Sequence, residues 1–119
     1  MELNTILTLQ EAGVDTEGAV RRFSGNSGLY ERFLNKFLSD PTFGMVTDAF
    51  KAGAAQVAMT ANHTFKGLAD NLGLTKLYNI SSAMVSIIRD GDYGAAAGTF
   101  PDLKAAYDEI CGILKKGLL

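Results

Sequence analysis

Apolar side chains recur along this chain at intervals of three and four residues, which is the period of an α-helix. No alternating β-branched run of useful length accompanies them. The chain has only two prolines, Pro41 and Pro101, and a proline inside a helix costs about 3 kcal/mol. We therefore expect a break near Asp40-Pro41 and a disturbance from Gly98 to Pro101. The predicted helices cover about 2–11, 16–23, 27–51, 54–71, 75–90 and 92–116.

Each long segment can place its apolar residues on one face. For the segment 54–71 the predicted inward face consists of Val57, Ala61, Phe65, Leu68 and Leu72. Glycines follow the segments at Gly53, Gly73 and Gly91, where a left-handed residue commonly ends a helix. Long amphipathic helices joined by short turns predict an all-α fold, an antiparallel up-down-up-down four-helix bundle. We expect one domain over residues 1–119, with the bundle at about 27–117 and short N-terminal helices, 2–24, packed at one end.

The composition of the chain excludes several classes of protein. The 119 residues are 47% hydrophobic and 20% charged, which is too apolar for a disordered chain. The net charge of −2 gives no basic excess for nucleic acid, so no nucleic-acid partner is expected. No apolar run approaches the roughly 18 residues that a membrane span needs. Glu2 stands where a signal peptide carries Lys or Arg, so we expect a cytoplasmic protein without a membrane partner.

The chain contains one cysteine, Cys111, and one histidine, His63. A single cysteine excludes an intramolecular disulfide, and its spacing from Ile110 and Leu114 predicts a small core side chain. A zinc site needs about four ligands, of which at most two here could be Cys or His. No cofactor and no metal are therefore expected, and any chemistry that needs an imidazole must use His63.

His63 lies on the polar side of the predicted helix 54–71. If Ala61 and Phe65 face the core, the imidazole faces solvent in the middle of a long helix. Residues of the same face, which could contact a partner, are Gln56, Met59, Thr60 and Asp70.

Two further residues of this face bear on chemistry. Gly67 lies one turn beyond His63 and costs the helix about 1 kcal/mol relative to alanine, yet it leaves room for another surface to approach. Lys66 places an ammonium group near the ring, where it can partly neutralise an anion. A neutral imidazole, with an ordinary pKa of about 6.5, is a good nucleophile and can accept a phosphoryl group. Separately, each of these residues is also typical of an ordinary helix surface.

The stretch His63-Thr-Phe-Lys66-Gly67, followed by Asn71-Leu72-Gly73, resembles the His-x-x-Lys-Gly signature of histidine-containing phosphotransfer (HPt) domains. The resemblance extends over about residues 13–116. It includes Gly13-Val14-Asp15, the lead-in at 19–23, the aromatic segment at 29–37 and the Asp90-Gly91-Asp92 turn. Two positions depart from the family pattern: Asn62 stands where Ala is frequent, and Phe65 where Leu is commoner.

The resemblance implies a phosphorelay intermediate. His63 accepts a phosphoryl group from the aspartate of one receiver domain, in a hybrid sensor kinase, and passes it to the aspartate of a response regulator. Lys66 supports the phosphohistidine, Gly67 leaves room for docking, and Mg²⁺ belongs to the receiver. The chain is expected to be a monomer without an ATP site of its own.

Two other functions fit the same sequence. The exposed face could bind receiver-like partners without transfer, as a helical interaction module. Alternatively, the aromatic-rich segment 29–50 could belong to a bundle that holds an apolar ligand. An exposed His63 favours transfer, whereas a buried and hydrogen-bonded His63 would contradict it.

Overall fold

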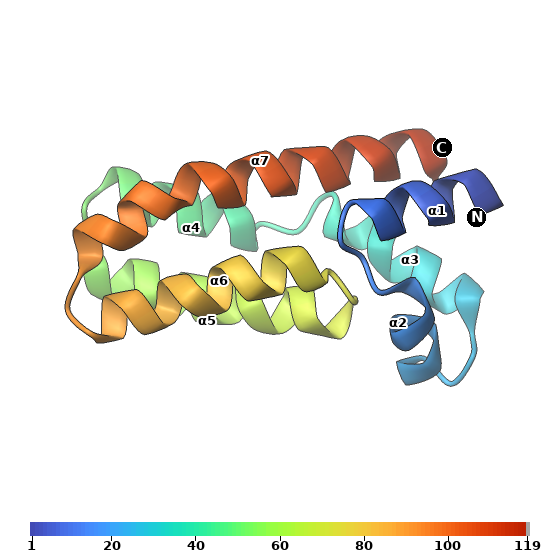
Figure 1. The fold of residues 1–119 in the computed structure, drawn as a ribbon, viewed down its shortest axis with the longest axis horizontal. Coiled ribbons are helices and arrows are strands. Elements are labelled where there is room, and N and C mark those ends of the chain that lie inside the picture. Colours follow the sequence, from blue (N-terminus) through green and yellow to red (C-terminus); the bar gives the residue numbers. More distant parts are fainter. Residues whose placement is uncertain (119) are drawn as a thin grey trace.

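The computed structural model describes residues 1–118, and within this range it contains seven α-helices and no strand (Figure 1). The predicted all-α class is therefore confirmed. The helices are α1 (Leu3–Glu11), α2 (Thr16–Arg22), α3 (Ser27–Phe37), α4 (Thr42–Lys51), α5 (Ala55–Asn71), α6 (Thr75–Arg89) and α7 (Tyr93–Gly117).

The helix boundaries follow local signals that the sequence carries. The break predicted near Asp40-Pro41 separates α3 from α4, and the Asp40 carboxylate accepts a hydrogen bond from the Thr42 N–H at 2.8 Å. Asp92 caps α7 by accepting from the Ala95 N–H at 3.0 Å. Gly53, Gly73 and Gly91 all have positive φ angles, as expected of residues that end helices.

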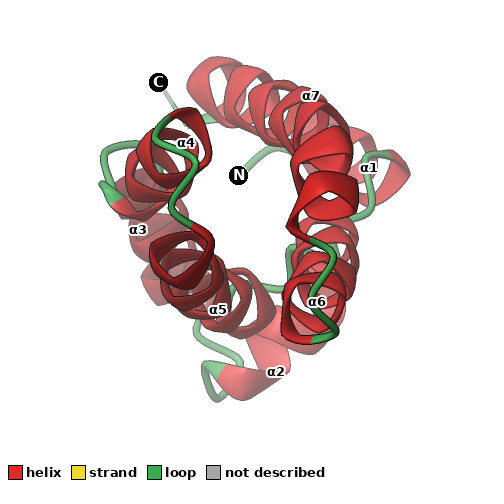
Figure 2. Cartoon of the chain, turned by 90° about the vertical axis from the view of Figure 1, so that its left-hand side faces the viewer, coloured by secondary structure: helices red, strands yellow, loops and turns green. Residues whose placement is uncertain are grey.

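The helices α4 to α7 surround one interior when the molecule is viewed along its long axis (Figure 2). In chain order, α4 packs on α5, α5 on α6 and α6 on α7. Their interior is aromatic: Phe65 of α5 lies 5.4 Å from Phe43 of α4, and Phe43 stacks on Tyr107 of α7, ring centre to ring centre 3.9 Å. Phe65 is wholly buried, so α5 is anchored from the side opposite to His63.

The N-terminal helices hold the turn between α5 and α6. The Asp15 N–H donates to the Gly73 carbonyl at 2.7 Å, and the buried Tyr30 hydroxyl donates to the Leu72 carbonyl at 2.7 Å. A side chain at position 73 would meet the Asp15 carbonyl oxygen at 2.6 Å, so only glycine fits there. These contacts fix the end of α5 that follows the histidine.

Two predictions about the helices were wrong. Val57 is 58% exposed, because the buried row of α5 starts at Ala58 and Val57 stands at its edge. No interruption occurs between Gly98 and Pro101, since α7 runs through both. Pro101 is exposed, so its ring lies on the solvent side of a helix whose other side is held by the buried Ala96 and Leu103.

Candidate functional site

The structure places His63 on the exposed side of α5, eight residues after the helix begins. Its ring makes no hydrogen bond and no ion pair with any residue in the described range. Its backbone is held by a 17-residue helix packed on both α4 and α6.

The other predicted site residues share this face. Gln56, Thr60, Gly67 and Asp70 are exposed, while Met59 and Lys66 are half-buried. Lys66 forms no ion pair within residues 1–118, so its charge is not neutralised by a neighbouring carboxylate there.

Gly67 has no packing role that the structure reveals. A Cβ built at this position would find no atom within 4 Å outside its own helix backbone and chain neighbours. Close helix packing, the ordinary reason for a glycine inside a helix, therefore does not apply. The helix bears a cost of about 1 kcal/mol at a position that opens onto solvent beside His63.

A groove of about 240 Å³ runs beside His63 between α5 and α6. Its walls are Met59, Thr60 and His63 from α5, and Val85 and Arg89 from α6. The groove therefore combines the imidazole with an apolar wall and an exposed guanidinium. Lys66 and Gly67 lie on the same face of α5 but outside the groove.

Sequence reasoning missed Val85 and Arg89. Both are on α6, four residues apart, and so form one stripe of that helix. The available signal was the short turn at 72–74, which makes α5 and α6 antiparallel neighbours. The turn does not fix how α6 is rotated about its own axis, and this rotation determines which row of α6 side chains lies beside His63.

Asn62, next to His63 in sequence, lies on the inner side of α5 and is wholly buried. Its side-chain amide donates to the Ser81 backbone carbonyl of α6 at 3.3 Å. Within the described chain, the Asn62 Oδ1 and Ser81 Oγ atoms have no hydrogen-bond partner. A buried polar atom left unpaired costs about 1–3 kcal/mol, so this is an expensive place for an amide.

A threonine and an arginine complete the polar surroundings. The Thr60 hydroxyl donates to the Gln56 carbonyl at 3.1 Å, which leaves its oxygen only an accepting role. The Arg22 guanidinium of α2 donates to the Asp70 carbonyl at 2.8 Å, at the far end of the same face. The side of α5 that carries His63 thus has Lys66 on it and Arg89 of α6 beside it, while Arg22 of α2 reaches only its far end at Asp70.

The other candidates from the sequence have structural explanations. Cys111 is buried, as expected of a core side chain, and Asp90-Gly91-Asp92 forms the turn that caps α7. Within residues 1–118, no group of three or more His, Cys, Asp or Glu side chains is arranged to hold a metal ion.

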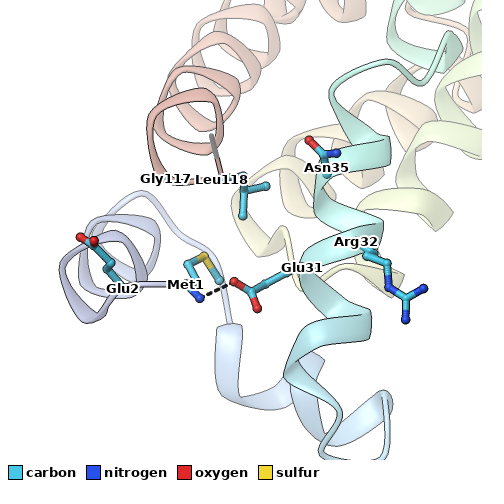
Figure 3. Close-up of a pocket in the computed structure, with 7 residues that line it drawn as sticks. All are labelled: Met1, Glu2, Glu31, Arg32, Asn35, Gly117 and Leu118. Atoms are coloured by element: carbon cyan, nitrogen blue, oxygen red, sulfur yellow. Dashed lines mark ion pairs between the residues drawn. The ribbon is translucent and has the colours of Figure 1, made fainter.

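A second hollow lies where the two ends of the chain meet (Figure 3). There the Met1 ammonium group pairs with Glu31 of α3, and Leu118 closes one side. The hollow shares no residue with the groove beside His63. Its ion pair is explained by joining the N-terminus to α3.

Comparisons with protein-family models, with curated proteins and with solved structures found no match to this chain. In the part of the chain that the structure describes, no helix has both the length and the apolar character to cross a bilayer.

Proposed function

We propose that this chain is a histidine phosphotransfer protein of a phosphorelay, with His63 as the residue that carries the phosphoryl group. The observation that carries the proposal is a solvent-exposed, unpaired imidazole at the middle of a rigid helix, beside a glycine above which the space is open. Gly44, Gly98 and Gly112, which also lie inside helices, are equally open, so the proposal depends on Gly67 lying one turn beyond His63 on the same face. The His-x-x-Lys-Gly resemblance supports the same function.

The chemistry needs little from this chain beyond position and charge. A ring nitrogen of neutral His63 attacks the phosphorus of a receiver's aspartyl phosphate. The N–P bond forms as the P–O bond to the aspartate breaks, and the aspartate leaves as a carboxylate. In the second transfer a carboxylate of another receiver attacks the same phosphorus and His63 leaves. Phosphoryl transfer depends mainly on such positioning and on charge stabilisation.

Two cations of this chain are suited to the phosphohistidine. Lys66 follows His63 by three residues on the same face, and Arg89 reaches the groove from α6. Both are without an ion-pair partner in the described range, so their charges are available to a bound phosphoryl group. In this proposal Mg²⁺ belongs to the receiver and not to this chain.

The proposed fold is the up-down-up-down four-helix bundle, with α3 and α4 together as the first long helix. The contacts of α4 with α5, α5 with α6 and α6 with α7 support it, as do the short turns between these helices. In this arrangement Gln56, Met59, Thr60 and Asp70 belong to the docking surface. We further propose a cytoplasmic monomer that meets a sensor kinase receiver and a response regulator.

The test is transfer from a receiver domain that carries a labelled aspartyl phosphate. We expect label on this chain that is lost in acid, as a phosphoramidate is, and no label on the His63→Gln variant. Circular dichroism of the variant checks that it keeps its helices. Label on His63→Gln would refute the proposal, since the chain has no other histidine. Receiver binding without any transfer would instead identify an interaction module.

A further inference from the structure

The contact between Asn62 and α6 differs from every other contact beneath the site. The residues around it on the buried side of α5 are Ala58, Ala61, Phe65 and Ala69, all apolar. Apolar contacts are non-directional and tolerate small shifts along a helix. The hydrogen bond from the Asn62 amide to the Ser81 carbonyl spans 3.3 Å, slightly longer than the usual range of about 2.7–3.2 Å, so a further shift of α6 along α5 would break it.

A contribution to stability does not account for the hydrogen bond between Asn62 and Ser81. The Asn62 Oδ1 and Ser81 Oγ atoms lack partners within residues 1–118, so the pair is only partly satisfied. An apolar side chain of similar volume would avoid this burial cost. Buried polar groups of this kind can instead fix the register of neighbouring helices.

The register of α6 decides what stands beside His63. Ser81, Val85 and Arg89 follow one another at four-residue intervals and so lie on one stripe of α6. The first accepts the Asn62 bond, and the other two line the groove with His63. A shift of one residue along an α-helix is a movement of about 1.5 Å. Misplacements of about 1 Å can change a reaction rate by two orders of magnitude.

We infer that Asn62 is a positioning residue: its bond to Ser81 holds α6 in the register that places Arg89 and Val85 at the His63 groove. This inference rests on the proposed phosphotransfer function. It assigns a role to a side chain that never touches the phosphoryl group.

The test compares Asn62→Leu, which removes the bond at similar volume, with Ser81→Ala, which keeps the accepting backbone carbonyl. We expect Asn62→Leu to remain folded while its rate of transfer to a receiver falls roughly two- to five-fold, no more than in Arg89→Ala. Ser81→Ala should transfer at the wild-type rate. Asn62→Ala replaces the leucine variant if leucine does not fold.

Combining Asn62→Leu with Arg89→Ala distinguishes a role of Asn62 in positioning Arg89 from a general loss of stability in the Asn62→Leu protein. If Asn62 acts through Arg89, the double variant Asn62→Leu/Arg89→Ala should transfer as Arg89→Ala alone. Effects that multiply, or an Arg89→Ala protein with normal transfer, would overturn the inference. So would an Asn62→Leu protein that transfers normally.

A readout that needs no transfer distinguishes failure of this inference from failure of the proposed function. The NMR signals of the Val85 methyl groups and the Arg89 side chain should move in Asn62→Leu and stay in place in Ser81→Ala. Unmoved signals overturn the inference. A wild-type protein that takes no label overturns the proposed function instead, and with it the role of Asn62 in transfer.

Discussion

Replacement of Gly67 by alanine should make the protein more stable and a poorer phosphotransfer partner. The added methyl group meets no atom within 4 Å beyond its own helix and chain neighbours, so no clash opposes the change. The gain is the helix propensity difference between alanine and glycine, about 1 kcal/mol. For 119 residues the entropy of unfolding is about 0.25 kcal/mol/K, which converts this gain to a rise in Tm of about 4 °C.

The same methyl group should hinder a docked receiver. It stands on the His63 face, one turn beyond the imidazole, where the proposed partner approaches. We expect transfer from a phosphorylated receiver to slow, and to slow further as the side chain grows from Gly67→Ala to Gly67→Gln. Thermal unfolding and timed transfer assays on the same preparations measure both effects.

Gly112 provides the matched control. It is an exposed glycine inside α7, with no atom within 4 Å of an added Cβ, and it lies away from the groove. Gly112→Ala should gain similar stability with unchanged transfer. If Gly67→Ala transfers as fast as Gly112→Ala, the space above Gly67 is not a docking space. A fall in Tm for Gly67→Ala would show that the space above Gly67 is not open in the folded protein.

The remaining predictions concern charge, packing and alkaline pH. Lys66→Ala and Arg89→Ala should each shorten the lifetime of the phosphohistidine by roughly two- to five-fold, since an exposed charge pair contributes about 0.5–1 kcal/mol; unchanged hydrolysis rates would show that neither cation holds the group. Phe65→Ala should lower the free energy of unfolding by about 3–5 kcal/mol, measured by urea denaturation, because Phe65 is wholly buried among aromatic rings. Burial raises the pKa of Tyr30, Tyr107 and Cys111 above their ordinary values of 10.0, 10.0 and 9.0. The unfolded chain loses these protons first, so stability should hold below about pH 9 and fall as the pH rises further; Tyr107→Phe should lessen the fall, and a stability that rises above pH 10 would refute this assignment.

Much of the secondary structure could be predicted because its signals are local. Helical periodicity located all six predicted segments, and the glycines with positive φ angles ended three of them. The break at Asp40-Pro41 was predicted from the geometry of proline alone. Pro101 was misjudged because the cost of a proline can be borne by a long helix whose buried side is well packed.

The exposed side of α5 was also predictable, since 3.6 residues per turn fix the angle between His63 and Phe65. Whether a residue at the edge of the buried row of α5 is itself buried could not be predicted, as the exposed Val57 shows. An edge position is buried or open according to how far the next helix extends over it, which is a property of the pair.

The sequence by itself determined the helices, the single imidazole and the side of α5 on which it lies. Only the tertiary structure decided that Arg89 and Val85 meet His63, that Asn62 is buried against Ser81, and that the space above Gly67 is open. The physical reason is that periodicity fixes angles within one helix. The rotation and axial register of α6 against α5 depend on how whole side-chain surfaces pack, and these two quantities set the surroundings of the histidine.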